Sequence, residues 1–428
     1  MTPQSDSSSG TTIRLLSPLR DFLKTESSGA ILLAGSAIFA LIWANSPWSG
    51  SYESLWSSHI AITVAGHSLD LSLRHWVNDG LMTIFFFVVG LEIKREVTSG
   101  HLSNRRAALL PGIAAIGGMV VPALIYLLIA GQTAPRGWAI PMATDIALAI
   151  GVMSVAKGRI PASLRAFLLG LAIVDDIGAI IIIALVYSTG VKFGWLTAAC
   201  VGVVMALLIR RSGVQSVLAY VLIGVVVWFA MYQGGIHPTI AGVIMGVMAP
   251  ATVQPQSELV NVDEVADSSE SGFESGEHTA RRGSVSVVEW LEHILHPWSS
   301  YMIVPIFALA NSGINVSING LRDAAGSPIT WGVFLGLLVG KPLGVVLASK
   351  IAVRIGVADS PQDATGVHML GAGTAAGIGF TVALFITELA FDNPVDQTNA
   401  KIAILMSSVV AVIAAIAILM RRKTTEEI

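Results

Sequence analysis

The chain has 428 residues, of which 54% are apolar and 12% are charged, and its mean hydropathy is +0.72. Soluble domains carry about 25% charged residues, so a soluble enzyme of this size is excluded. The formal net charge of −3 gives no reason to expect a nucleic-acid partner. A membrane-spanning helix needs about 20 apolar residues, and a chain of this length has room for about a dozen.

The two ends of the chain are polar. Residues 1–28 are rich in serine, and no cleavable signal is evident in them, so we expect a cytoplasmic tail. Within it we expect residues 1–12 to be disordered and Ile13–Lys24 to form a short amphipathic helix on the membrane surface. Residues 421–428 form the second tail. The single cysteine, Cys200, lies in an apolar run, so no disulfide framework exists.

Apolar runs predict an all-α integral membrane protein with about twelve transmembrane helices across residues 29–420. The runs are 29–47, 78–96, 107–130, 138–156, 164–187, 193–209, 214–231, 236–250, 298–312, 330–352, 367–390 and 400–420. Nineteen of the 25 Lys and Arg residues fall in the tails and one set of alternate connections, five in the other set, and one, Lys341, inside a run. Basic residues concentrate in cytoplasmic connections, so both termini are expected to be cytoplasmic.

Two segments are expected to lie outside the membrane. Residues 59–73 alternate apolar and polar residues around Ala65-Gly66-His67, which predicts an exterior β-hairpin. Residues 251–286 are rich in Ser, Glu and Asp, which indicates a flexible acidic cytoplasmic loop, and a solvated linker is its simplest interpretation.

Ionisable residues inside a bilayer are costly, so each is a functional hypothesis. The candidates are Asp79, Asp145, Asp175, Asp176, Lys341 and Glu388, with Glu92 and Glu96 at a cytoplasmic helix end. Asp175 and Asp176 lie about ten residues into the run 164–187, roughly at mid-bilayer. A buried carboxylate without a nearby cation favours its protonated form, so a proton and a metal cation would compete for these oxygens. A purely structural pair is the alternative interpretation.

Two predicted spans carry signs of interruption. Pro141 disfavours helix at Ile140, so this span is expected to break just before Thr144-Asp145. Residues 371–381 hold four glycines, although close helix packing would also explain them. A pair of interrupted spans indicates a transport site at the bilayer midplane. Asp145 and Lys341 could offset the partial charges at the broken helix ends.

Lys341, in LLVGKPLGVV, is the only basic residue at mid-depth. Its depth and its sign make it a candidate partner for one of the aspartates. A buried lysine could release a proton when its aspartate binds a cation instead. A structural role for Lys341 remains the alternative.

Eight segments of the sequence closely resemble the NhaA-type sodium/proton antiporters of bacterial inner membranes. They are NDGLMTIFFFVVGLEIKREV (78–97), AAIGGMVVPALIY (114–126), GWAIPMATDIALAIGV (137–152), LAIVDDIGAIIIIAL (171–185), HPTIAGVIMG (237–246), LEHILHPW (291–298), GKPLG (340–344) and GIGFT (377–381). They follow one another in family order and cover most of the chain from Asn78 to about Phe391.

The resemblance implies twelve helices in two inverted repeats, with the fourth and eleventh spans interrupted and crossing at mid-membrane. It implies that Asp176 is the principal cation ligand, with Asp175 beside it and paired with Lys341, and that Thr144 and Asp145 lie at the site. It also implies pH-regulating residues and a homodimer through the hairpin 59–73. The residues matching the pH-regulating positions are Glu92, Glu96, His237, Glu292, His293 and His296.

The sequence departs from the family pattern in two places. Glu289 and Trp290 stand where basic residues are common in the family, which bears on the pH of activation. Glu388 matches no family motif, and an interfacial residue is its simplest interpretation. Taken alone, His293 and His296 would also fit a weak metal site or a surface helix cap.

These features predict a secondary antiporter and not an enzyme, in which cytoplasmic Na⁺ or Li⁺ leaves as protons enter. No cofactor is expected, and the partners are the transported ions and the membrane lipid. An intramembrane aspartyl protease would need aspartates that face each other from different helices and a Gly-x-Gly-Asp motif, which does not occur. A cation channel would not be expected to contain the deep lysine. No Walker A sequence supports a primary pump.

Overall fold

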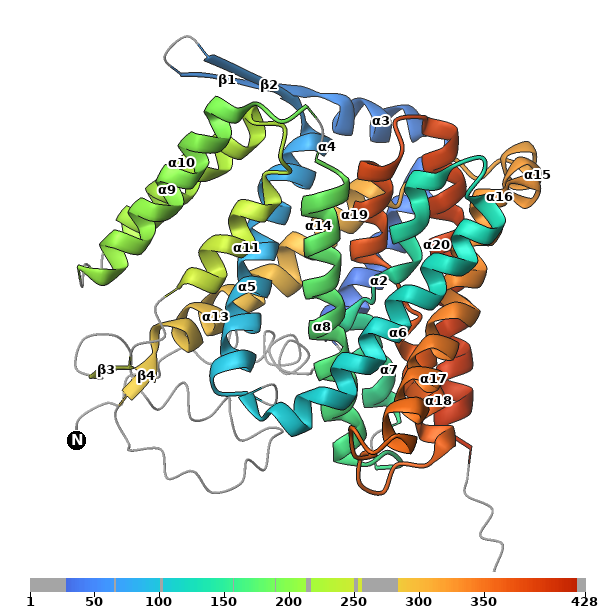
Figure 1. Cartoon of the computed structure of the whole chain (residues 1–428). Coiled ribbons are helices and arrows are strands. Elements are labelled where there is room, and N and C mark those ends of the chain that lie inside the picture. The colour runs from blue at the N-terminus through green and yellow to red at the C-terminus, as the bar shows by residue number, and fades with distance from the viewer. Residues whose placement is uncertain are drawn as a thin grey trace, which may run out of the picture.

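A computed structural model describes residues 28–64, 67–100, 103–156, 158–188, 190–212, 217–249, 253–255 and 284–421 (Figure 1). The expected surface helix at 13–24, both tails beyond residue 421 and before residue 28, and most of the acidic segment 251–286 lie outside these residues. Of that acidic segment the structure describes two short strands, β3 (Val253–Pro255) and β4 (Ser284–Ser286), which pair antiparallel.

One end of the molecule carries the predicted hairpin. Helix α2 (Ser28–Ala44) meets α3 (Ser49–Ser57) at a bend of 113°. Strands β1 (His59–Val64) and β2 (His67–Ser72) follow and pair antiparallel, with His59 opposite Ser72. The short helix α4 (Leu73–His75) then leads into the first long helix. The expected β-hairpin is confirmed, and we call this end of the molecule the hairpin end and the opposite end the far end (Figure 1).

The remaining elements are helical, and the label η marks 3-10 or π-helical turns. They are η1 (Trp76–Leu81), α5 (Met82–Thr98), α6 (Arg105–Ala130), η3 (Pro135–Met142), α7 (Ile146–Val155), α8 (Ala162–Val186), α9 (Phe193–Arg211), α10 (Val217–Gln233), α11 (Thr239–Met248), α13 (Val287–Trp298), η5 (Ser299–Ile303), α14 (Val304–Asn311), α15 (Ile318–Gly326), α16 (Pro328–Leu335), η6 (Gly336–Gly340), α17 (Lys341–Arg354), α18 (Gly366–Ala376), α19 (Thr381–Ala390) and α20 (Pro394–Leu419). Each of the twelve apolar runs contains helix.

Several helix boundaries follow from local sequence. Asn393 accepts a hydrogen bond from the Val395 amide at the start of α20, and Pro394 occupies the first turn, where its missing N–H costs nothing. Thr365 and His368 form a reciprocal capping box at the start of α18. These caps fix where the last two spans begin.

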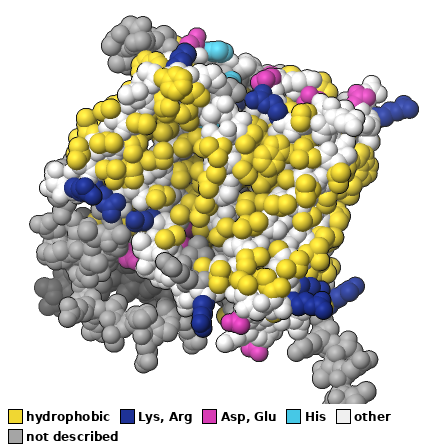
Figure 2. Space-filling view, viewed as in Figure 1, with side chains coloured by type: hydrophobic (Ala, Val, Ile, Leu, Met, Phe, Trp, Pro, Cys, Tyr) yellow, Lys and Arg dark blue, Asp and Glu magenta, His cyan; other side chains and the backbone are white. Residues whose placement is uncertain are grey.

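Seven helical segments among the described residues are long and apolar enough to cross a membrane, and two bent pairs raise the number to nine. The seven are Leu73–Thr98, Arg106–Ala130, Pro135–Val155, Ala162–Val186, Phe193–Arg211, Pro328–Arg354 and Pro394–Leu419. Figure 2 shows a broad band of hydrophobic side chains between two rims where charged side chains gather. The expected all-α membrane architecture is confirmed.

Glycines allow the central helices to pack backbone against backbone. A Cβ added at Gly117 would lie 2.5 Å from the Gly344 carbonyl oxygen, and a Cβ at Gly344 would lie 2.2 Å from the Gly117 carbonyl oxygen. Real Cβ atoms do not approach so closely, so α6 and α17 can pack at this short distance only because both positions are glycine. This contact brings Lys341, the first residue of α17, into the core.

Candidate ion site

Two helix breaks meet in the core. The chain is extended at Ala143 and Asp145, between η3 and α7, which is the interruption that Pro141 predicts. A second break separates α18 from α19, whose axes differ by 47°. The Asp145 amide donates a hydrogen bond of 2.6 Å to the Ile378 carbonyl, and so joins the two breaks. A Cβ at Gly379 would lie 2.7 Å from the Ala143 carbonyl oxygen, so glycine is required at this crossing.

Asp145 caps both half-helices that start at the crossing. Its Oδ1 accepts a hydrogen bond of 3.0 Å from the Leu148 amide at the start of α7. Its Oδ2 accepts one of 3.0 Å from the Thr381 amide at the start of α19. A helix N-terminus carries partial positive charge and unpaired amide donors. One buried carboxylate therefore satisfies the start of both half-helices, and its oxygens are engaged with backbone.

Asp175 forms a buried ion pair with Lys341. The Lys341 Nζ lies 2.6 Å from Asp175 Oδ2, and both side chains are fully buried. The Thr144 hydroxyl lies 2.8 Å from the same carboxylate oxygen and 2.9 Å from the Ala376 carbonyl. Lys341 also donates to the Met142 carbonyl, the last residue of η3. Lys341 thus contacts a carbonyl at the C-terminal end of η3, and Thr144 contacts one at the C-terminal end of α18.

Asp176 has a different environment. It is the next residue of α8, so its side chain points about 100° away from that of Asp175, and it is 5% exposed. Within the described residues, its Oδ1 has no hydrogen-bond partner, and the same is true of Asp175 Oδ1. The site therefore offers two buried carboxylate oxygens with free lone pairs, next to a lysine that balances one negative charge. Oxygen is the ligand that small hard cations prefer.

A second charged cluster lies where α5 meets α13 at the far end. Arg95 Nη1 lies 2.6 Å from Glu292 Oε1, and Arg95 Nη2 lies 3.6 Å from Glu96 Oε1. Glu96 and Glu292 are buried. Glu92 lies one turn before Glu96 on α5. We call these four residues the α5–α13 cluster.

Burial raises the pKa of Glu292, which lies outside the seven long segments and the two bent pairs, to about 7. The Arg95 charge opposes this rise, whereas the carboxylates of Glu92, Glu96 and Glu289 add to it. Glu292 therefore titrates near neutral pH.

The structure separates the candidate histidines. His293 and His296 are exposed on α13, beside the α5–α13 cluster. His237 lies in the turn between α10 and α11, next to the Tyr187 backbone. In that turn the Lys192 amide donates a hydrogen bond to the Gly234 carbonyl. The turn lies at the hairpin end, because Trp228 of α10 stacks on Trp76, and the Trp76 ring donates a hydrogen bond to the Ile60 carbonyl of β1. His237 is therefore not part of the α5–α13 cluster.

Ionisable side chains enclosed where two broken helices cross are the arrangement in which secondary transporters bind ions. The fold and the site thus define a multi-pass membrane protein of the ion-transporter class. The family model described as Na⁺/H⁺ antiporter 1 matches residues 20–419. The chain belongs to the Na⁺/H⁺ antiporter family.

Curated relatives agree over nearly the whole chain. The chain is 43% identical to "Na(+)/H(+) antiporter NhaA 2" of Syntrophotalea carbinolica over 424 residues, which cover 95% of this chain and 97% of that protein. It is 42% identical to "Na(+)/H(+) antiporter NhaA 3" of Frankia alni, over 94% and 88% of the two chains. It is 41% identical to "Na(+)/H(+) antiporter NhaA" of Oleidesulfovibrio alaskensis, over 93% and 92%.

Four groups that make buried polar contacts are not indicated by the sequence alone. Arg95 was not assigned a role, although a cation between Glu92 and Glu96 was a signal that buried glutamates would need a counter-charge. The Thr381 amide and the Met142 carbonyl are backbone groups at the crossing, and no side-chain pattern points to them. Lys401 was counted only as a residue of a connection, whereas its Nζ lies 2.5 Å from Glu388 Oε1.

Proposed function

We propose that this protein is a secondary active antiporter that exports cytoplasmic Na⁺ or Li⁺ in exchange for entering protons. The observation that carries the proposal is the pair of adjacent buried carboxylates, Asp175 held by Lys341 and Asp176 with an oxygen that no described residue bonds. The membership of the chain in the Na⁺/H⁺ antiporter family supports it. Asp176 is the principal ion ligand, and Asp175 is the second.

Exchange follows from competition for these oxygens. A buried carboxylate must be neutralised by a proton or by a cation. When Na⁺ binds Asp175 and Asp176, it replaces a proton and weakens the hold of Lys341 on Asp175. A site that holds neither Na⁺ nor a proton would carry an unbalanced buried charge while it turns from one side of the membrane to the other, which is costly. The empty site therefore does not cross, and the two ion flows are coupled.

Thr144 and Asp145 position this site. The Thr144 hydroxyl lies within hydrogen-bond distance of both the Asp175 carboxylate and the Ala376 carbonyl, and it can donate its one proton to either. Asp145 fixes the starts of α7 and α19 relative to each other. A tilt of the half-helices would open the carboxylates to one side of the membrane at a time, and no cofactor is required.

The α5–α13 cluster is the proposed pH regulator, with His293 and His296 beside it and His237 acting at the hairpin end. Its support is the near-neutral titration of Glu292 next to Arg95. We further propose the bacterial inner membrane as the location, both termini and the far end on the cytoplasmic side, and a homodimer formed through residues 59–73. A hairpin deletion that left the dimer mass unchanged in light scattering would contradict that last point.

Asp176→Asn tests the proposed function. The amide keeps the shape of the side chain but can neither hold a proton nor balance a cation, so Na⁺-dependent proton movement in everted vesicles should be abolished. Asp359→Asn, an exposed residue between α17 and α18, is the control and should exchange normally. Retained Na⁺-dependent proton movement in the Asp176 variant would overturn the assignment.

A further inference from the structure

A cavity of about 390 Å³ opens at the hairpin end, away from the central carboxylates. Residues of α3, the hairpin, α4 and the end of α19 line it. Its ionisable lining residues are Glu53, His59, Arg74, His75, Glu388 and Asp392. This cavity and the α5–α13 cluster lie at opposite ends of the molecule. In a membrane, the cavity would therefore face the solution on the other side from the cluster.

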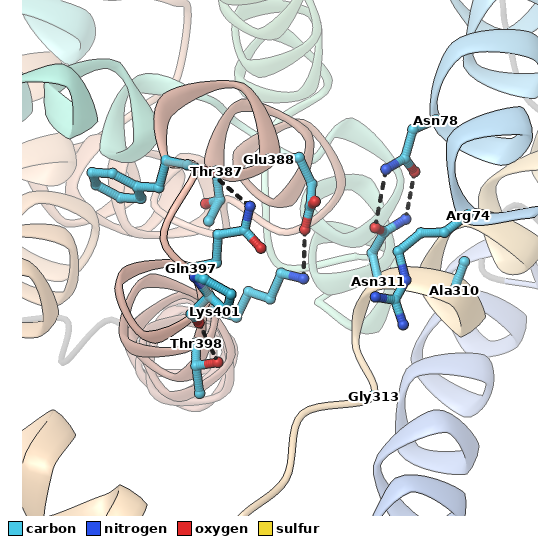
Figure 3. Close-up of polar contacts among 12 residues, drawn as sticks. Arg74, Asn78, Ala310, Asn311, Gly313, Thr387, Glu388, Gln397, Thr398 and Lys401 are labelled. Atoms are coloured by element: carbon cyan, nitrogen blue, oxygen red, sulfur yellow. Dashed lines mark hydrogen bonds and ion pairs between the residues drawn. The ribbon is translucent and has the colours of Figure 1, made fainter. Parts of the chain in front are cut away.

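Most of these groups are held by surface neighbours. Arg74 Nη2 lies 3.2 Å from Glu53 Oε2, and His59 Nδ1 lies 3.0 Å from Asp70 Oδ1. Glu388 differs, because its partner reaches it from the interior. The Lys401 Nζ of α20 lies 2.5 Å from Glu388 Oε1, and the side chains of Lys401 and Glu388 are only 10% and 17% exposed (Figure 3).

Helix α19 connects Glu388 to the candidate ion site. It follows Thr381 by seven residues on α19, so the two residues share one face of the helix, about 10 Å apart along its axis. Thr381 is the residue whose amide binds Asp145. Leu384 and Phe385 lie between them and are buried, and Phe385 packs on Phe86 and Phe307. An apolar layer therefore separates the cavity from the crossing in this state.

We propose that Glu388 is a second ion-binding carboxylate, a station where a proton or a small monovalent cation pauses between the hairpin-side solution and the central site. This inference rests on the proposed antiport function. Lys401 takes the place of the ion while the station is empty, as Lys341 does at Asp175. An ion that arrives through the cavity neutralises Glu388 and displaces the ammonium group of Lys401, which keeps its own proton.

The charges around Glu388 fit this role. Lys401 faces it from α20, Asp392 from the α19–α20 connection, and Arg74 with Glu53 from α4 and α3. Two cationic and three anionic side chains leave the cavity with one excess negative charge when its two histidines are neutral. Such a cavity attracts cations from solution.

The test measures the two sides separately. In right-side-out and everted vesicles, the apparent KM for Na⁺ is determined on the hairpin side and on the far side. Glu388→Gln should raise the hairpin-side KM about tenfold, the factor that corresponds to one lost charged contact of about 1.4 kcal/mol, and leave the far-side KM unchanged. Asp323→Asn, which removes an exposed carboxylate of α15 that does not line the cavity, is the matched control and should change neither value.

Lys401→Met separates a station from a structural ion pair. It removes the competing ammonium but keeps the carboxylate, so the hairpin-side KM should fall. If the pair were only structural, both variants would change both KM values in the same direction, and this result would overturn the proposal. Unchanged hairpin-side values in both variants would overturn it too. Wild-type protein without Na⁺/H⁺ exchange would instead refute the proposed function itself.

Discussion

At the residue scale, Asp175 and Lys341 balance each other in a region that water barely reaches. Both side chains are fully buried, and Thr144 and the Met142 carbonyl complete their contacts. Removing one partner of a buried ion pair leaves an unbalanced buried charge and destabilises the fold by roughly 3–5 kcal/mol. The pair is therefore a structural element, and in the proposed mechanism it is also the place where a bound cation is exchanged.

Lys341→Ala should lower the unfolding midpoint of the purified protein and move transport to a more alkaline range, or abolish it. Without the ammonium, Asp175 stays neutral by keeping its proton, and Na⁺ must displace that proton against a stronger hold. The pH profile of Na⁺-dependent exchange measures this change. Lys350→Ala, on an exposed position of the same helix α17, is the control. An unchanged pH profile for Lys341→Ala would remove Lys341 from the proton-carrying role.

The sequence could show which charged residues are costly to bury in a membrane, but not which of them contact one another. The depth of Asp175, Asp176 and Lys341 followed from their apolar surroundings, because a charge in such a run is a clear signal. The contact of Lys341 with Asp175 joins α17 to α8. The depth and sign of Lys341 suggested an aspartate as its partner, but only the resemblance to a known family pointed to Asp175. The Glu388–Lys401 pair had no such support, and an interfacial glutamate was the natural interpretation.

At the scale of elements, the crossing of two broken helices and the junction of α5 with α13 do different work. The crossing holds the candidate ion site, and its breaks were predictable from Pro141 and from the glycines of 371–381. The junction depends on Arg95 and Glu292, and the second of these is buried beside other carboxylates. A carboxyl whose pKa is raised in the folded protein destabilises the fold as pH rises through that pKa. The α5–α13 contact should therefore loosen above pH of about 7.

If ionisation of Glu292 switches exchange on, Glu292→Gln should shift the activating pH upward by roughly one unit, or flatten the pH profile. The amide stays neutral at every pH, so the junction keeps its low-pH contact where the wild-type glutamate ionises. The measurement is the initial exchange rate from pH 6 to pH 9. Asp359→Asn, another far-end carboxylate, should leave the profile in place. A Glu292→Gln profile that coincides with wild type would exclude the cluster as the sensor.

At the scale of the whole molecule, a hydrophobic belt separates two charged rims (Figure 2), and the β-hairpin distinguishes one end from the other (Figure 1). Apolar run length predicted the helices well, since each of the twelve runs contains one. It could not predict the 113° bend between α2 and α3, or that α11 is only ten residues long, because these depend on packing against neighbours. In α11, Gly242 and Gly246 lie against the backbone of α5.

The orientation of these ends can be measured with single cysteines in a Cys200→Ser background. Asp70→Cys, on the exposed hairpin, should react with a membrane-impermeant maleimide in intact cells. Asp359→Cys, at the far end, should react only after the cells are opened. This is the direction that the excess of Lys and Arg in one set of connections predicts. The reverse labelling pattern would invert the proposed topology.

The most direct test of the account is Na⁺ binding to the purified protein by calorimetry across pH, with buffers of different ionisation enthalpy to count released protons. If Na⁺ and H⁺ compete for the carboxylates of Asp175 and Asp176, the Kd for Na⁺ should rise about tenfold for each unit that the pH falls, and each bound Na⁺ should release about one proton. Na⁺ affinity that stays constant with pH, with no proton released, would contradict the account.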